Sequence, residues 1–159
     1  MVCTGNICRS PTAEGVLRAK LTAAGLGERV QVGSAGITGY HSGEAPDPRA
    51  QRHAAKRGYD LSALRARRIA PEDYEHFDLI LALDGEHLAH LQAHAPAASR
   101  ARVQPLLRYA RRLAGAADVP DPYYGSADGF ERVLDLVEDA CDGLVESLAA
   151  ELGSTGAVD

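Results

Sequence analysis

The sequence predicts one α/β domain: a four-stranded parallel sheet with helices on both faces, a doubly wound arrangement of the flavodoxin type. Its 159 residues, 45% of them hydrophobic, are enough for one domain with a single core. Segments with a strand pattern alternate with segments of helical spacing, which is typical of a parallel sheet. The continuous apolar run DLILAL at residues 78–83 is typical of a strand buried on both sides. We therefore expect a domain over residues 1–152 and a disordered tail over residues 153–159.

The first half of the chain contains two helix patterns with a strand pattern between them. Residues 11–25 have apolar side chains at helical spacing, with a proline at the start and a glycine at the end, so they predict a helix. Valines at positions 30 and 32 alternate with polar residues, which predicts a short strand. Asp47-Pro48 is typical of a helix start, and this second helix is expected to end near Gly58.

The second half repeats the alternation. The strand at 78–83 is followed by helical spacing over about 85–95, and VQPLL at 103–107 predicts a further short strand. A long amphipathic helix is predicted from Asp128 to about Leu152.

Charge and hydropathy exclude several classes of function. The formal net charge of -5 disfavours a nucleic-acid binder, whose surface would be basic. No run of about 18 apolar residues is present to span a bilayer, and the first residues lack the pattern of a secretory signal. We therefore expect a cytoplasmic protein that binds neither nucleic acid nor membrane.

The cysteines and histidines do not follow the spacing of a metal site. Cys3, Cys8 and Cys141 form no CxxC pair and no four-ligand zinc set, and a disulfide framework is not expected in a chain without a secretory signal. Cys141 lies on the apolar stripe of the last helix, so we expect it in the core. Three histidines share one face of the helix at 85–95 and are interpreted as a solvated face, namely His87, His90 and His94.

The string VCTGNICRSP, at residues 2–11, is the strongest chemical feature. Cys3 and Arg9 bracket five residues just before a helix, so inward-pointing backbone N–H groups and the helix dipole would build a cradle for an anion. The helix terminus and the guanidinium favour the nucleophilic thiolate form of Cys3. The planar fork of Arg9 matches two phosphate oxygens. Gly5 permits tight curvature, and Asn6 tolerates a left-handed backbone conformation.

This string resembles the phosphate loop of the low-molecular-weight protein tyrosine phosphatases, which reads (V/I)CxGNxCRSP. The similarity continues through SAG at 34–36, PDPRA at 46–50, Ala66-Arg67, FDLILALD at 77–84 and DPYYG at 121–125. The resemblance implies a phosphatase that acts on a phosphotyrosine-containing protein, with Cys3 as nucleophile and Arg9 on the phosphate. The other loop residues that would bind phosphate or support the loop are Thr4, Gly5, Asn6, Ile7, Cys8 and Ser10.

In this family the aspartate of the DPYYG stretch is the general acid, and it corresponds to Asp121. It would protonate the leaving tyrosine and then deprotonate the water that hydrolyses a phosphocysteine. The Ser10 hydroxyl would ease the departure of sulfur, or alternatively cap the following helix. Tyr123 and Tyr124 would form an aromatic wall of the substrate crevice, and Tyr40 would lie on its rim. No metal or cofactor is required.

Two departures from the family pattern bear on the expected structure. Only two residues precede Cys3, so the first, central strand is cut to a stub, and added upstream residues are expected to raise the melting temperature. Where the family often has a histidine that braces the loop asparagine, this chain has Leu64, and we expect Ser34 to hold Asn6 instead. The resemblance suggests that Cys8 pairs with Cys3 under oxidation; the alternative is that Cys8 fills space beneath the loop.

Three other activities stay open. Arsenate reductases of this fold share the loop, but they need relay cysteines that LALDGEHLAHLQAH, at residues 81–94, lacks. A phosphotyrosine-binding module would keep the loop and lose the nucleophile, the arginine or the acid, all of which are present. A phosphoarginine phosphatase tends to have threonine in place of Ile7, whose apolar side chain suits a phenyl ring. Phosphotyrosine hydrolysis is therefore favoured. We also expect the protein to be a monomer.

Overall fold

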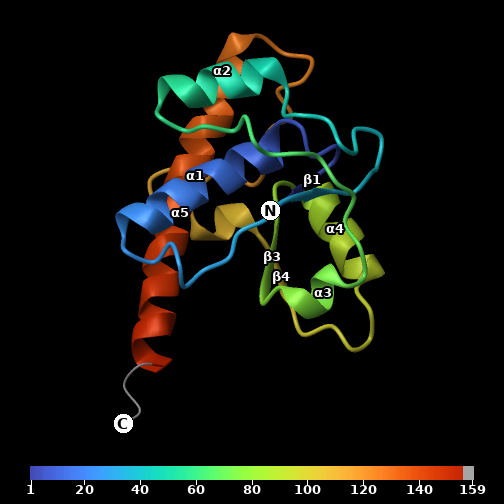
Figure 1. The fold of residues 1–159 in the computed structure, drawn as a ribbon, viewed down its shortest axis with the longest axis vertical. Coiled ribbons are helices and arrows are strands. Elements are labelled where there is room, and N and C mark those ends of the chain that lie inside the picture. The colour runs from blue at the N-terminus through green and yellow to red at the C-terminus, as the bar shows by residue number, and fades with distance from the viewer. Residues whose placement is uncertain (156–159) are drawn as a thin grey trace.

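Four parallel strands form one sheet in the order β2-β1-β3-β4 (Figure 1), as described for residues 1–155 by the computed structural model. The strands are β1 (Val2–Cys3), β2 (Ala35–Gly36), β3 (Leu79–Ala82) and β4 (Arg102–Pro105). The helices are α1 (Arg9–Ala23), α2 (Pro48–Lys56), α3 (Asp73–His76), α4 (Gly85–His94), the 3-10 helix η1 (Leu106–Tyr109) and α5 (Ala127–Thr155). The predicted fold class is confirmed.

Successive residues of β3 supply two separate cores, one on each face of the sheet. Leu81 packs with α1 and α5, whereas Ile80 and Ala82 pack with Tyr74 of α3 and Leu91 of α4. Figure 1 shows the same division, with α1 and α5 on one side of the strands and α3 and α4 on the other. Burial on both faces explains why this strand reads as a continuous apolar run.

The strand order places a topological switch point at the carboxyl end of β1. Because β1 lies between β2 and β3, the chain leaves it toward β2 and later crosses to β3 on its other side. Ligands of open α/β sheets bind at such a switch point, outside the carboxyl ends of the strands. The segment between Cys3 and α1 occupies this position.

The long helix α5 is joined to η1 by close backbone contact. A Cβ added at Gly143 would lie 1.9 Å from the Tyr109 carbonyl oxygen, so only glycine fits there. Asp139, which is buried, accepts hydrogen bonds from the backbone N–H groups of Arg111 and Leu113, both at 2.9 Å. Although burial acts in the opposite direction, these bonds hold the pKa of Asp139 below its ordinary value. The backbone at residues 111–113 is therefore fixed to α5, and the segment that leads to Asp121 begins there.

Two strand predictions need correction. The second strand is Ala35–Gly36, not the segment around Val30 and Val32, because its partner β1 pairs only through Val2↔Ala35 and Cys3↔Gly36. The segment predicted as a strand at 103–107 is divided: β4 ends at Pro105 and η1 follows. The helices predicted at 11–25, 47–58, 85–95 and 128–152 are confirmed as α1, α2, α4 and α5, with shifted ends. Helix α5 includes 153–155, which were expected in the tail; 156–159 lie outside the described residues.

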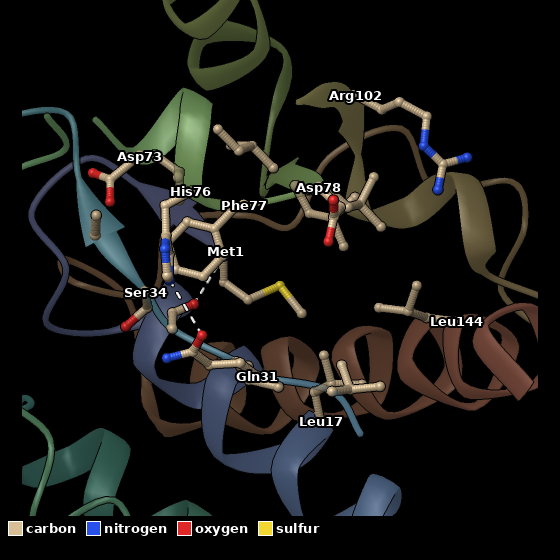
Figure 2. A pocket seen from close by; sticks show the side chains of 18 of the residues that line it. Met1, Leu17, Gln31, Ser34, Asp73, His76, Phe77, Asp78, Arg102 and Leu144 are labelled. Atoms are coloured by element: carbon tan, nitrogen blue, oxygen red, sulfur yellow. Dashed lines mark hydrogen bonds between the residues drawn. The ribbon is translucent and has the colours of Figure 1, made fainter. Parts of the chain in front are cut away.

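A cavity of about 560 Å³ lies at the opposite end of the sheet from that switch point, beside Met1 (Figure 2). Leu17, Phe77 and Leu144 line it together with the edge of β3. The Met1 ammonium donates to the Gly33 carbonyl at 3.1 Å, and burial lowers the pKa of this amino group to about 6. The two-residue β1 thus begins beside a partly apolar space. Among residues 1–155, no helix is both long and apolar enough to cross a bilayer.

Candidate active site

Residues 3–10, here called the phosphate loop, connect β1 to α1 and turn tightly at Asn6. Asn6 has φ 59°, the left-handed conformation that the sequence predicted for it. Its side chain donates hydrogen bonds to Ser10 Oγ (2.7 Å) and Ser34 Oγ (2.9 Å), and it accepts one from the Arg67 backbone N–H (3.0 Å). The prediction that Ser34 holds Asn6 is confirmed. Ser10 at the end of the loop and two distant segments, at Ser34 and Arg67, therefore fix the turn.

A buried carboxylate extends this network, and the sequence analysis did not find it. Ser34 Oγ donates to Glu14 Oε1 at 2.6 Å, and Glu14 also pairs with Arg18 at 2.7 Å. Glu14 is only 5% exposed although it lies on α1 among apolar residues. A charged residue on the inward face of a predicted helix was the pattern that could have revealed it.

The sulfur of Cys3 lies 3.0 Å from Ser10 Oγ, and both residues are buried. Ser10 is the second residue of α1 and the N-cap position is Cys8, so the alternative that Ser10 caps this helix is wrong. The Ser10 oxygen accepts from Asn6, so its own proton can point at the sulfur. The hydroxyl is therefore placed to donate to a thiolate at position 3.

Arg9 is buried. Its guanidinium is anchored beyond the end of β3, which lies on the other side of β1 from β2. It donates to Asp84 Oδ2 at 2.8 Å and to the Val119 carbonyl at 3.1 Å. Asp84 is also the N-cap of α4 and accepts from the His87 backbone N–H. Burial alone would raise the pKa of Asp84, but the bond from His87 and the Arg9 charge lower it below its ordinary value. An ionised Asp84 therefore orients the arginine.

His87 is not part of a solvated face, so this prediction is wrong. It is 2% exposed, and its Nε2 lies 2.9 Å from Thr4 Oγ1 and 3.5 Å from the Arg9 guanidinium. Burial, followed by the Arg9 charge, lowers its pKa to about 4. His94 is exposed and stacks on His90 at 3.9 Å. Across the described part of the chain, no group of three or more metal-ligating side chains is placed to hold a metal ion.

Residues 120–126, here called the acid loop, bring Asp121 to the same centre. Asp121 Oδ2 lies 3.8 Å from the Arg9 guanidinium, while its Oδ1 accepts from the Tyr123 backbone N–H at 3.0 Å. Arg49 of α2 donates to the Tyr123 carbonyl at 3.1 Å and stacks over the Phe130 ring, 4.9 Å from its centroid. The sequence analysis missed Arg49, which holds this loop from a distant segment.

The three tyrosines named from the sequence lie on the surface. Tyr123 and Tyr124 pack edge to face, with ring centroids 4.9 Å apart, and Tyr124 is 92% exposed. Tyr40 is also exposed, and it follows Thr38, whose backbone N–H bonds the Thr4 carbonyl at 3.0 Å. Both aromatic segments therefore border loops that carry the candidate site.

Cys8 packs beneath the phosphate loop, beside Ala50 and Phe130, with Ile7 against the same cluster. Burial raises the pKa of the Cys8 thiol to about 12, with a smaller contribution from Asp47. This position fits the space-filling alternative; the oxidative pairing with Cys3 stays a prediction, and both thiols are free in the structure.

Cys141 is fully buried in α5, which confirms that it belongs to the core.

The chain matches the family model described as low molecular weight phosphotyrosine protein phosphatase over residues 1–154. It is 46% identical over 153 residues to a low molecular weight protein-tyrosine-phosphatase of Streptomyces coelicolor, covering 95% of this chain and 93% of the relative. A protein tyrosine phosphatase structure from Entamoeba histolytica is 35% identical, with a TM-score of 0.90 and coverage of 94% and 95%. YfkJ from Bacillus subtilis is 36% identical, with a TM-score of 0.86 and coverage of 94% and 92%. The chain therefore belongs to the low molecular weight phosphotyrosine protein phosphatase family.

Proposed function

We propose that the protein hydrolyses phosphotyrosine in proteins, as well as small aryl phosphates, through a phosphocysteine on Cys3. The observation that carries this proposal is the convergence of three residues on one centre. Cys3 and Arg9 stand at the two ends of one short loop, and Asp121 reaches the Arg9 guanidinium at 3.8 Å. A nucleophile, an anion clamp and a proton donor are the parts that phosphoryl transfer to cysteine requires.

In the first step the Cys3 thiolate attacks phosphorus and the bond between phosphorus and the tyrosine oxygen breaks. Asp121, protonated at this stage, gives its proton to the departing oxygen, so that tyrosine leaves as a neutral phenol. The side chain of Asp121 is 52% exposed, which leaves it accessible to a bound substrate and to solvent.

In the second step water attacks phosphorus and the bond between phosphorus and sulfur breaks. The Asp121 carboxylate accepts the proton of the attacking water, and inorganic phosphate leaves. The Ser10 hydroxyl, 3.0 Å from Cys3 Sγ, stabilises the thiolate that departs. Ser10 therefore acts on the leaving group of this step.

The charge on the phosphoryl oxygens is balanced by the loop amides and by Arg9. The two anchors of Arg9, Asp84 and Val119, hold the guanidinium in one orientation before substrate arrives. A preorganised donor stabilises the transition state without reorganising during the reaction. The proposed reaction involves no metal or cofactor.

The substrate ring is proposed to lie among Tyr40, Tyr123 and Tyr124, whose exposed rings border the two loops. Aromatic side chains favour a flat phenyl group over a flexible guanidine. Ile7 adds apolar surface within the phosphate loop, which supports phosphotyrosine over phosphoarginine as the substrate. We expect the enzyme to be a monomer, which gel filtration would test. We expect it to act on its phosphoprotein in the cytoplasm, which cell fractionation would test.

Turnover of aryl phosphates with different leaving groups tests the proposal. We expect Cys3→Ser to lose turnover while it still binds phosphate. Asp121→Ala should lose about 100-fold or more with phenyl phosphate, whose leaving group has a high pKa, and much less with a nitrophenyl ester. Equal losses with both esters would contradict the role of Asp121.

The same preparations separate the competing functions. A phosphotyrosine peptide should be hydrolysed faster than a phosphoarginine peptide. Binding of the phosphotyrosine peptide without turnover would indicate a recognition module. Reduction of arsenate with thioredoxin, without ester hydrolysis, would indicate a reductase.

A further inference from the structure

His87 belongs to α4 but reaches the phosphate loop from the side opposite Asn6. Its ring is buried, although the helix pattern placed it with the half-buried His90 and the exposed His94. The residue is held in position because Asp84, three residues earlier, caps α4 and accepts the His87 backbone N–H at 2.9 Å. The mechanism above makes no use of this side chain.

The neighbours of the ring determine which nitrogen carries the proton. A guanidinium can only donate, so Nε2, 3.5 Å from Arg9, must present its lone pair. The Thr4 hydroxyl, 2.9 Å from the same nitrogen, then donates as well. The proton is left on Nδ1, which lies 3.1 Å from Asp84 Oδ1 but forms no hydrogen bond there. His87 is thus a neutral acceptor.

We propose that His87 is a positioning residue which joins the two ends of the phosphate loop by accepting hydrogen bonds from both Thr4 and Arg9. This inference rests on the function proposed above. Thr4 follows the nucleophile directly, and Arg9 is the phosphate clamp. Both side chains bond to the same buried nitrogen of His87. If either end of the loop shifted relative to the other, one of these two hydrogen bonds would be lost.

The charges around the ring are consistent with a neutral imidazole. Burial disfavours the protonated form most strongly, and Arg9 acts in the same direction, so that the pKa falls to about 4. Asp84, Asp121 and Asp118 act in the opposite direction but do not prevail. Protonation would remove the acceptor and place a second positive charge beside Arg9.

The hydrogen bonds of His87 are separate from the Asn6 network that holds the middle of the phosphate loop. Asn6 is bonded to Ser10, Ser34 and the Arg67 backbone, whereas the His87 ring is bonded to Thr4 and Arg9. The loop is therefore held at its centre from one side and at its ends from the other. Loss of the His87 bonds should leave the loop folded but the guanidinium less well aimed.

The test compares His87→Leu, which removes the acceptor, with His87→Gln, whose amide oxygen can replace Nε2. His90→Leu on the same helix is the matched control, and thermal unfolding checks that each variant is folded. Calorimetry measures the affinity for phosphate, a tetrahedral ligand, and for vanadate, which can adopt the five-coordinate geometry of the transition state. These affinities do not depend on turnover.

We expect His87→Leu to lower kcat and vanadate affinity about tenfold, with a smaller change in KM and phosphate affinity. His87→Gln should recover most of the loss, and His90→Leu should match the wild type. Thr4→Val combined with His87→Leu should cost less than the sum of the two single changes. A uniform loss of phosphate and vanadate affinity, or equal behaviour of the Leu and Gln variants, would overturn the proposal.

The protonation state provides a second measurement, which needs no activity. In spectra of the protein with nitrogen-15-labelled histidine, His87 should be neutral above pH 5, with its proton on Nδ1. A ring protonated on Nε2, or one that titrates near pH 6.5, would contradict the arrangement. If the wild type proved inactive on every phosphate ester, the proposed function would fail while the spectra and vanadate affinities still decided the role of His87.

Discussion

The phosphate loop and the acid loop meet at one site but are held in different ways. The phosphate loop has a buried turn at Asn6, whose side chain forms three hydrogen bonds, one to Ser10 within the loop and two to distant segments. The acid loop is largely exposed and is tied mainly by Arg49 and by a bond within its own turn. A phosphoryl group always has the same shape, whereas leaving groups differ. In the proposed reaction, the rigid phosphate loop would hold the constant phosphoryl group, and the more exposed acid loop would meet the variable leaving group.

The largest effect should come from breaking the phosphate loop at its turn. Asn6→Ala removes three hydrogen bonds and places alanine in the left-handed region, a cost of about 2–4 kcal/mol in loop organisation. We expect kcat to fall by 100-fold or more with phenyl and nitrophenyl esters alike. Asn6→Gly tolerates the left-handed backbone conformation, so it should regain only the part of the loss that is due to backbone strain, not the part due to the missing hydrogen bonds. Near-normal turnover in Asn6→Ala would show that the loop holds without this network.

Gly36 of β2 packs directly against the backbone of the phosphate loop. A Cβ at Gly36 would lie 2.9 Å from the Thr4 carbonyl oxygen and 3.0 Å from that of Thr38, and neither backbone atom can move alone. Gly36→Ala should lower kcat about tenfold or more and the melting temperature by several degrees. Gly39→Ala is the control, because its Cβ would meet only side chains at 3.5 Å or more. Identical melting curves for the two variants would contradict this packing argument.

The acid loop should respond differently. Arg49→Ala removes the bond to the Tyr123 carbonyl and the stacking on Phe130, so Asp121 would be less well placed. Turnover of phenyl phosphate should fall about tenfold, whereas the nitrophenyl ester should be almost unaffected. Arg52→Ala, exposed on the same helix, should change neither. Equal losses on both esters would mean that Arg49 also supports the phosphate loop.

Acid should weaken the rigid side of the site through His87. Its pKa is about 4 in the folded protein against 6.5 in the unfolded chain, so unfolding takes up a proton between these values. Stability is therefore complete above pH 6.5 and declines as the pH falls toward 4; at pH 4.5 the loss is about 2–3 kcal/mol. Asp84, whose pKa is lowered, adds a further loss at still lower pH.

Urea unfolding at pH 7 and pH 4.5 measures this decline. The drop should be smaller in His87→Gln by about 2 kcal/mol, and His94→Gln, which changes an exposed histidine, should retain the wild-type drop. A drop that is equal in all three proteins would assign the acid sensitivity to other groups.

The smallest effect on activity is expected at the cavity beside Met1, away from both loops. Extension of the N-terminus by four apolar residues would prolong β1 into a space of about 560 Å³ and remove a buried ammonium. The melting temperature should rise by about 5 °C or more, with kcat unchanged. Extension by four Gly-Ser residues is the control, and an equal rise in that protein would argue against burial as the cause.

The candidate site could be predicted in part because its central residues lie close together in the sequence. Cys3, Asn6 and Arg9 fall within seven residues and precede a helix start, so local backbone geometry alone brings them together. Asp121 was found through family resemblance. Its position beside Arg9 depends on a chain path that no local pattern describes.

His87 and Arg49 were missed for a physical reason. The spacing of His87 with His90 and His94 indicates a shared helix face, but only the docking of the α4 N-terminus on the phosphate loop buries the first of them. Arg49 and Tyr123 are separated by 74 residues. Periodicity describes which side chains share a face and does not say what that face contacts.

The chain by itself determined the order of elements, the apolar β3 run, the turn at Asn6 and the helix that receives the phosphate loop, because these depend on neighbouring residues. The tertiary structure decided the position of β2, whose two residues are the ones that pair with the two residues of β1. It also decided the partners of Arg9, which lie 75 and 110 residues away. Long-range acceptors are selected by packing of the whole domain, so their identity emerges only once the sheet and its helices are assembled.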